Sequence, residues 1–273
     1  MILLWTESLR GYGINRIFEL AKSAGYDGID LSVDFGQFDT TNAEYLKKLS
    51  KEYDIPIHAV SSPEQVAAKR IKELVDLTKA VGAKVLVLQP PKLLDFKLAS
   101  WLKKEIPRLR EKEFLSIALE NAPAGTFLGF IPEYAMTNTQ ELKKFKHISL
   151  DTARIGEKRQ DLMRAYSAFK KYLVHVHLSN VYKGKKYAPP KEGIMPLESF
   201  LTKLKQDKYP GAISIKILPK YLHAGEDAKV VEDLQDVKKY YEKYYKNVEA
   251  IETKEENKET PEDTQEETQK NFQ

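Results

Sequence analysis

Short apolar runs alternate with amphipathic stretches along most of this chain. Eight runs rich in β-branched and other apolar residues predict strands, at residues 2–5, 28–31, 56–60, 84–88, 115–120, 148–151, 173–178 and 212–217. Between them, apolar residues recur at three- and four-residue spacing and predict helices, at residues 14–24, 43–53, 63–81, 98–111, 139–145, 159–172, 196–206 and 227–245. Each predicted strand is followed by a predicted helix, so the pattern indicates eight successive βα units.

This alternation favours two α/β architectures. Strands that are apolar over their whole length are typical of a sheet that is buried on both faces. Eight βα units in about 245 residues favour a closed (β/α)₈ TIM barrel, and we predict one barrel domain over residues 1–247. An open, doubly wound sheet is the alternative, but it requires a glycine-rich phosphate loop after the first strand. The chain offers only Gly11-Tyr12-Gly13 there, without the third glycine of that fingerprint.

The composition is typical of a large globular domain and excludes all functions that depend on cysteine. With 42% hydrophobic residues among 273, the chain has enough apolar material for a sizeable core. It has no cysteine, which excludes disulfides, thiolate metal ligands and a cysteine nucleophile. The apolar run at residues 1–5 is far shorter than the about 20 residues that cross a bilayer, and it lacks the features of a signal peptide. We therefore expect a cytoplasmic protein with no membrane partner.

Charge is unevenly spread along the chain. The whole chain carries +4, but residues 248–273 hold nine acidic residues against three lysines, a net charge of −6. Residues 1–247 therefore carry +10. The C-terminal segment has few apolar residues, so it cannot bury enough surface to offset chain entropy. We predict a disordered acidic tail over residues 248–273, which serves solubility or, alternatively, folds back on a basic face or binds a partner.

Polar side chains stand where several apolar strands end, and in a barrel these strand ends carry the chemistry. Glu120, Asp151 and His177 close three consecutive strands and are expected to converge. Two carboxylates and an imidazole are a plausible set of ligands for Mn²⁺, Mg²⁺ or Zn²⁺. The alternative is three unrelated polar groups that hydrogen-bond to loops. The other strand ends supply Glu7, Asp30, Ser32, His58, Gln89, Arg154 and Lys216.

Six segments, in this order, resemble the xylose isomerase-like TIM barrel superfamily. They are GYDGIDL (25–31), IPIHAV (55–60), LSIALEN (115–121), ISLDTARIG (148–156), LVHVHLSN (173–180) and GAISIKI (211–217). That superfamily contains sugar-phosphate isomerases and epimerases, hydroxypyruvate isomerase and the endonuclease IV group of abasic-site nucleases. The resemblance covers almost the whole predicted barrel. It implies that Glu120, Asp151 and His177 are metal ligands and that His58 lies at the barrel mouth, where it binds substrate.

Two positions depart from the pattern that the resemblance implies. Arg154 stands where the superfamily carries a histidine, and Lys216 stands where it usually carries a second metal-binding glutamate. In the epimerases, the two glutamates bind the metal and exchange protons with the carbon next to a carbonyl. Lys216 therefore removes a ligand and changes the local charge from −1 to +1. Because a nearby cation repels a divalent ion by several kcal/mol, metal affinity is expected to be weakened or lost.

The resemblance makes Glu120, Lys216 and His177 the candidate catalytic residues, and three roles remain open for Lys216. The first is an ion pair with Glu120 or Asp151, in which the ammonium replaces the charge of the metal. The second is a base or a Schiff-base nucleophile, which requires that burial lowers the pKa of Lys216. In the third, the site is inactive and the barrel only binds.

A further basic feature is expected at the barrel mouth. Arg154 and Lys183 are candidates to bind a phosphorylated or acidic ligand, because a guanidinium pairs with two oxygens at once and lysines add a positive field. The loop after the seventh predicted strand contains three more lysines, Lys185, Lys186 and Lys191. The alternatives are an internal pair of Arg154 with Asp151 or Glu157 and a solvated run of surface lysines.

Three functions follow as hypotheses. The first is a sugar or sugar-phosphate isomerase or epimerase that moves a proton next to a carbonyl, with its metal dependence altered or lost and a small carbohydrate or phosphorylated molecule as its ligand. The second is a non-catalytic binding barrel. The third is an endonuclease IV-like nuclease, for which the +10 barrel region is favourable. Only five histidines are present, and Arg154 and Lys216 occupy expected ligand positions, so nucleic acid is disfavoured as a partner.

Overall fold

The computed structural model describes residues 1–246 of the 273-residue chain. The acidic tail predicted over residues 248–273 lies outside the described residues, and so does residue 247 at the end of the predicted barrel domain.

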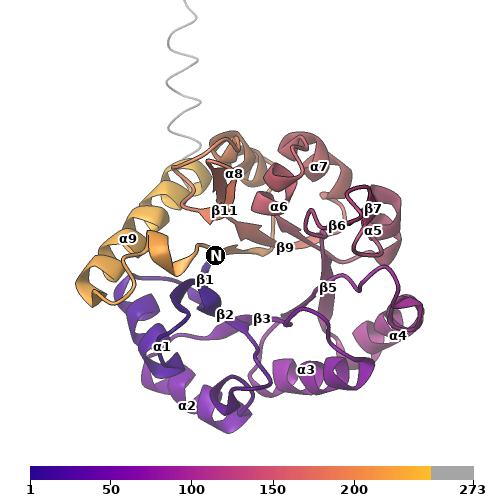
Figure 1. The fold of residues 1–273 in the computed structure, drawn as a ribbon. Coiled ribbons are helices and arrows are strands. Elements are labelled where there is room, and N and C mark those ends of the chain that lie inside the picture. Colours follow the sequence, from indigo (N-terminus) through magenta and orange to yellow (C-terminus); the bar gives the residue numbers. More distant parts are fainter. Residues whose placement is uncertain (247–273) are drawn as a thin grey trace, which may run out of the picture.

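Eight parallel strands close into a barrel at the centre of the molecule (Figure 1). Their order around the barrel is β1-β12-β9-β8-β5-β4-β3-β2, so the last strand pairs with the first. At this closing seam Ile2 lies opposite Ile213. The strands are β1 (Ile2–Trp5), β2 (Gly28–Ser32), β3 (Ile57–Ser61), β4 (Val85–Leu88), β5 (Ser116–Glu120), β8 (Ile148–Asp151), β9 (Leu173–Leu178) and β12 (Ala212–Ile215). The predicted (β/α)₈ barrel is confirmed.

Helices surround the strands on the outside of the barrel (Figure 1). The main ones are α1 (Ile14–Ser23), α2 (Ala43–Glu52), α3 (Ala68–Ala80), α4 (Phe96–Glu113), α5 (Thr139–Phe145), α7 (Leu162–Phe169), α8 (Leu197–Gln206) and α9 (Asp227–Tyr241). Each buries an apolar stripe; in α1 this stripe contains Ile14, Ile17, Phe18 and Ala21. Within residues 1–246, none of the helices combines the length and the apolar character needed to cross a membrane.

Some helix boundaries differ from the predicted ones for local reasons. Helix α3 begins at Ala68 instead of residue 63, and Gln65 before it has a left-handed backbone with φ of 56°. Helix α7 begins at Leu162 instead of residue 159, because Arg159 is also left-handed and Asp161 caps the helix by accepting a hydrogen bond from the Arg164 N–H. Helix α9 ends at Tyr241 and continues as one turn of π-helix, η4 (Glu242–Lys246).

Several elements at the carboxyl ends of the strands were not predicted. Two are hairpins, β6 (Thr126–Phe127) with β7 (Ile131–Pro132), and β10 (Asn180–Tyr182) with β11 (Lys185–Ala188). A third is the short helix α6 (Thr152–Glu157), which follows β8 directly. Three 3₁₀ turns complete the loops, η1 (Thr6–Leu9), η2 (Phe38–Thr40) and η3 (Pro219–Tyr221). These elements build the mouth of the barrel.

The carboxyl-terminal half of the barrel interior is polar. Alternate residues of a strand share a face, so residues two apart, such as His175 and His177, occupy successive layers of the interior. Polar and charged side chains fill these layers and are 0–3% exposed: Asp30, Ser61, Glu120, Asp151, His175, His177, Ser214 and Lys216. Buried polar groups need partners, so the contacts among these side chains decide what the barrel does.

Helix α5 begins with a reciprocal cap at Asn138. The Asn138 side-chain oxygen accepts a hydrogen bond from the Glu141 N–H at 2.9 Å, and its amide donates to the Glu141 carboxylate at 2.8 Å. We expect Asn138→Ala to lower the free energy of unfolding by about 1 kcal/mol, because both helix-start bonds are lost. Chemical denaturation measures this. The control is Gln140→Ala in the same turn, which is exposed and is expected to change little; equal losses would contradict the capping role.

Candidate functional site

Five charged side chains meet where β5, β8, β9 and β12 end. Glu120 and Asp151 are the last residues of β5 and β8, and His177 lies near the end of β9, opposite Asp151. Lys216 follows β12 directly, and Arg154 lies in the first turn of α6, where Asp151 caps the helix by accepting from the Arg154 N–H at 3.0 Å. We call these five residues the mouth network. Each is at most 3% exposed.

Lys216 lies between the two carboxylates of the mouth network. Its Nζ is 2.9 Å from Asp151 Oδ2 and 3.3 Å from Glu120 Oε1. Burial by itself lowers the pKa of Lys216, but the charges of Asp151 and Glu120 outweigh burial and raise the pKa above its ordinary value. The lysine is therefore a fixed cation at neutral pH. Lys216 thus makes the ion pair that was the first of the three expected roles, and a raised pKa is unfavourable for a neutral amine that acts as nucleophile or base.

Arg154 pairs with residues of the network, and it also lines the cavity above them. Its Nη1 lies 2.8 Å from Glu120 Oε2 and donates to the Asn121 carbonyl oxygen at 2.9 Å, while Nη2 donates to Gln89 Oε1 at 2.8 Å. Its Nε is 3.6 Å from Asp151 Oδ2. Of the two internal partners considered from the sequence, Asp151 is the one that Arg154 approaches. Glu157 instead pairs with Lys186, at 3.2 Å.

Glu120 is the acceptor on which the network converges. Besides Arg154 and Lys216, it accepts from Gln89 Nε2 at 2.9 Å and contacts His177 Nδ1. Burial raises the pKa of a carboxyl group, yet the surrounding cations hold the pKa of Glu120 well below its ordinary value. Glu120 therefore stays ionised and is a weak proton acceptor at neutral pH.

His177 bridges two carboxylates through its two ring nitrogens. Nδ1 faces Glu120, and Nε2 lies 2.8 Å from Asp30 Oδ2. Burial lowers the pKa of this imidazole, but Glu120 and Asp30 outweigh burial and raise it. Because each nitrogen needs a proton to donate to its carboxylate, the arrangement favours the imidazolium. The three carboxylates of Asp30, Glu120 and Asp151 are then balanced by three cations.

The sequence suggested Glu120, Asp151 and His177 as ligands of a divalent metal. Their ligand atoms lie within 4.8 Å of one another, which is close enough for one ion. In this arrangement, however, both carboxylates already face the ammonium of Lys216 and the guanidinium of Arg154. An added divalent ion would meet the ammonium of Lys216 and the guanidinium of Arg154 at ion-pair distance from the same carboxylates. These three residues do not fit a divalent metal as they stand.

A cavity of about 360 Å³ opens above the network. Lys216 and Arg154 form part of its floor, and its walls and rim contain Trp5, Glu7, Arg10, Ser32, Val33, Asp34, Ser62, Pro63, Glu64, Gln89 and Tyr187. Nζ of Lys216 lies 4.9 Å from the centre of the Trp5 ring and 5.1 Å from that of Tyr187. The cavity thus combines a cationic floor, two aromatic rings and an acidic rim.

Tyr187 reaches the cavity through a distortion of the β10–β11 hairpin. The register shifts between Asn180 and Val181, so one residue of β11 is left over opposite this step. Tyr187 is that residue, and its φ of 64° is rare for a bulky side chain. Strained residues of this kind concentrate at functional sites, because the strain aims a side chain that the regular strand would point elsewhere.

Two predicted substrate-binding residues lie away from this cavity. His58 is the second residue of β3, and its carbonyl oxygen accepts from the Lys84 N–H just before β4 begins, so it lies at the opposite end of the barrel from the mouth. The expected mouth position of His58 is therefore wrong: Ser61, three residues later, is the residue that ends β3 at the mouth. Lys183 lies in the exposed turn between β10 and β11, with Nζ 5.0 Å from the Tyr182 ring centre. Neither residue lines the cavity.

Other site residues were predicted only as polar strand ends or not predicted at all. Asp30 and Gln89 were among the polar strand ends, but nothing in the sequence gave them partners. His175 was missed, although its two-residue spacing from His177 places both on the same face of β9. The sequence did not predict Tyr187 as a site residue. Its position depends on a bulge in a hairpin, and the pattern of apolar residues does not mark that hairpin.

Comparison with curated proteins gives short matches. Uncharacterized proteins of Mycobacterium bovis and Mycobacterium tuberculosis are 26% identical to this chain over 113 residues, which is 38% of its length. The match spans 40% of the length of those relatives.

Comparison with solved structures gives long matches at low identity. A xylose isomerase domain protein from Alicyclobacillus acidocaldarius has a TM-score of 0.69 at 14% identity, over 91% of this chain and 100% of that one. The zinc-bound IolI protein has a TM-score of 0.69 at 15% identity, over 89% and 98%. An L-ribulose 3-epimerase has a TM-score of 0.67 at 12% identity, over 95% and 99%. At these identities the likeness shows a shared fold.

The comparison with protein families covers most of the barrel. Residues 18–240 match the family described as xylose isomerase-like TIM barrel, a span that runs from α1 to α9 and includes all five residues of the mouth network. This chain therefore belongs to the xylose isomerase-like TIM barrel family.

Proposed function

We propose that this protein binds a small carbohydrate-class ligand at the barrel mouth, and that Lys216 and Arg154 supply the positive charge that the resemblance assigns to a metal there. The observation that carries the proposal is the position of Lys216 Nζ. On one side it pairs with Asp151 and Glu120, and on the other it faces the cavity between two aromatic rings.

The cavity lining supports a polyhydroxylated ligand with a carbonyl or anionic oxygen. Carboxylates at the rim, such as Glu7, Asp34 and Glu64, accept hydrogen bonds from hydroxyl groups. The rings of Trp5 and Tyr187 offer flat apolar faces to the C–H groups of a sugar. A carbonyl, carboxylate or phosphate oxygen is best placed beside the Lys216 ammonium. The likeness to an L-ribulose 3-epimerase agrees with this ligand class.

The electrostatics of the network favour binding over proton transfer. Glu120 has a pKa held well below its ordinary value, and Lys216 has a raised pKa. A group exchanges protons efficiently only when its pKa lies near the working pH. Glu120 and Lys216 are therefore poorly suited to take and return a proton on a substrate carbon, and the non-catalytic binding barrel is the better supported of the two main hypotheses.

Tyr187 gives a direct test of ligand binding at this cavity. We expect Tyr187→Ala to weaken the affinity for a bound ketose or ketose phosphate about tenfold, because the stacking face and part of the cavity wall are lost. Calorimetric titration with pentuloses, hexuloses and their phosphates measures the affinity. The matched control is Tyr182→Ala in the same hairpin, which is exposed and outside the cavity. Added Mn²⁺ or Mg²⁺ should leave the affinity unchanged; a metal-dependent affinity would contradict the proposal.

One observation favours a second candidate, a metal-independent isomerase or epimerase. The Lys216 ammonium lines the cavity, where it is placed to stabilise the oxyanion that develops when a proton leaves the carbon next to a carbonyl. The proton acceptor would then be a rim carboxylate such as Glu7, Asp34 or Glu64.

Solvent exchange separates the two candidates. Any ligand that binds in the titrations is incubated with the protein in D₂O and followed by proton NMR. A binding barrel leaves the proton next to the carbonyl in place. Loss of that proton at a rate proportional to protein concentration, and abolished in Lys216→Met, would establish the isomerase or epimerase instead.

A further inference from the structure

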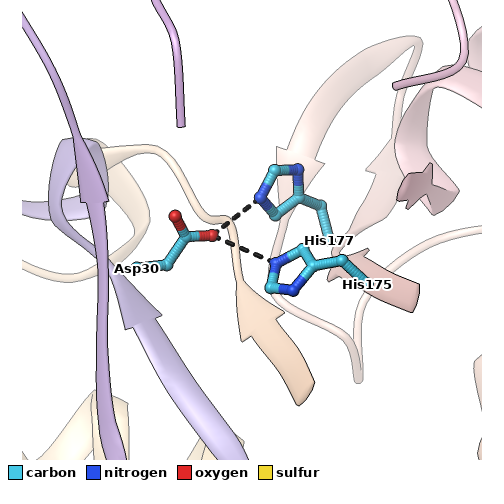
Figure 2. A group of neighbouring side chains, drawn as sticks. All are labelled: Asp30, His175 and His177. Atoms are coloured by element: carbon cyan, nitrogen blue, oxygen red, sulfur yellow. Dashed lines mark hydrogen bonds and ion pairs between the residues drawn. The ribbon is translucent and has the colours of Figure 1, made fainter. Parts of the chain in front are cut away.

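A second group of metal-ligating side chains lies one layer below the mouth network. Asp30 from β2 meets His175 and His177 from β9, and both Nε2 atoms point at the same oxygen of Asp30 (Figure 2). Asp30 Oδ2 lies 2.8 Å from His177 Nε2 and 3.2 Å from His175 Nε2. All three side chains are fully buried. We call this group the inner triad.

We propose that the inner triad binds one Zn²⁺ ion, which is a structural ion beneath the floor of the cavity. Two imidazole nitrogens and one carboxylate oxygen are among the commonest ligands of zinc. Zinc–ligand bonds of about 2.0–2.1 Å place tetrahedral ligand atoms about 3.3–3.4 Å apart. The two nitrogen–oxygen distances in the inner triad are 2.8 and 3.2 Å, so the ligands need to separate by only a fraction of an ångström.

Neighbouring groups orient the ligands as they do in metal sites. Ser61 Oγ donates to Asp30 Oδ1 at 2.8 Å, which leaves Oδ2 for the ion. Glu120 faces Nδ1 of His177 and keeps a proton there, and the ion would take the place of the second imidazolium proton, on Nε2. A carboxylate behind a histidine is the usual arrangement that fixes the tautomer and orientation of a zinc ligand. Ser214 Oγ lies 2.9 Å from His175 Nε2 and is close to the fourth position.

The inner triad also lacks the lysine and arginine that neutralise the carboxylates of the mouth network. The carboxylates of Glu120 and Asp151 each pair with Lys216 and Arg154, whereas the carboxylate of Asp30 contacts, among residues 1–246, two imidazoles and one hydroxyl. No fixed cation therefore has to be displaced from Asp30.

The hydrogen bonds of His175 leave its imidazole weakly held. Its Nδ1 is buried and has no hydrogen-bond partner among the described residues. Its Nε2 is shared between Asp30 and Ser214, at 3.2 and 2.9 Å. Buried polar atoms are rarely left in this state unless they have a redox, catalytic or ligating role. Coordination through Nε2 would give the ring a strong bond that the protein alone does not provide.

Two variants separate this site from the metal site that the resemblance implies. The two candidate sites share His177, but His175 belongs only to the inner triad and Asp151 only to the mouth network. The full chain is unfolded, refolded with Zn²⁺, passed over a desalting column and analysed by plasma mass spectrometry. We expect about one zinc per chain in the wild type and in Asp151→Asn, and at least a tenfold loss in His175→Gln. Asparagine at 151 keeps an oxygen to cap α6.

The opposite results would overturn the proposal. Zinc that is retained in His175→Gln but lost in Asp151→Asn would place the ion in the mouth network, and a wild type that binds no zinc would exclude the site. Because His175→Gln can fail to fold, X-ray absorption of the zinc-loaded wild type gives an independent answer. The inner triad predicts scattering from two imidazole rings, whereas the mouth network predicts one.

Discussion

Replacing Lys216 by methionine is expected to lower the free energy of unfolding by about 3–5 kcal/mol, the range measured when one partner of a buried ion pair is removed. Methionine keeps much of the side-chain volume, so the loss reports on charge. It leaves Glu120 and Asp151 buried with one cation fewer, and water cannot replace the ammonium because both carboxylates are fully buried. Urea denaturation followed by circular dichroism measures the change.

The control for Lys216→Met is Lys220→Met, four residues later. Lys220 is exposed and makes no ion pair within residues 1–246, so we expect a change within about 0.5 kcal/mol. Similar small losses in both variants would mean that the carboxylates do not depend on Lys216. A companion variant, Lys216→Glu, restores the carboxylate that the resemblance expects. We expect this variant to bind a divalent ion on the mouth network and the wild type not to bind one there.

Replacing Glu120 by glutamine should be similarly costly, by about 3–5 kcal/mol, because three cations lose the charge on which they converge. Arg154, Lys216 and His177 then lie close together in a buried region with Asp151 and Asp30 as their remaining counter-charges. Glutamine has nearly the same shape, so packing is preserved. The double variant Glu120→Gln/Lys216→Met should lose less than the sum of the two single losses, by about 1–3 kcal/mol, because one excess charge then offsets the other.

Acid titration gives Glu120→Gln a second readout. The pKa of Glu120 is lower in the folded protein than in the unfolded chain, so its ionised form stabilises the fold above the unfolded pKa of about 4.3. That stabilisation is lost as the pH falls from this value toward the folded pKa. The wild type should therefore lose more stability than Glu120→Gln between about pH 5 and pH 3. Parallel curves over this range, or additive losses in the double variant, would contradict a central role of Glu120.

The proposed zinc site and the proposed ligand site depend on different residues of the barrel interior. Ligand binding depends on the cationic floor and on Tyr187, which lie above the inner triad. Zinc binding depends on Asp30 and His175, which do not line the cavity. A protein that binds ketoses without zinc, or zinc without ketoses, would therefore reject one proposal and leave the other intact.

The fold could be predicted from the sequence because continuous apolar runs mark the strands of the barrel. All eight predicted strands are present, and most differ by only one or two residues at their ends. Helices with a clear apolar stripe were also found. The elements that were missed, α6 and the two hairpins, are short and are held by caps, bulges and cross-strand bonds at the barrel mouth. Such elements leave little periodic trace in the sequence.

The sequence by itself determined the βα order, the barrel and the polar residues at the strand ends, because continuous apolar runs mark buried strands and a three-to-four-residue repeat marks the buried face of a helix. Only the tertiary structure decided how those polar residues pair. Closing the barrel brings Lys216, just after the last strand, between Glu120 and Asp151. It also aims His177 at Asp30 of the second strand and leaves His58 at the far end of the barrel. Whether a carboxylate meets a lysine, an imidazole or a metal depends on distances across the barrel, and local sequence spacing carries no information about them.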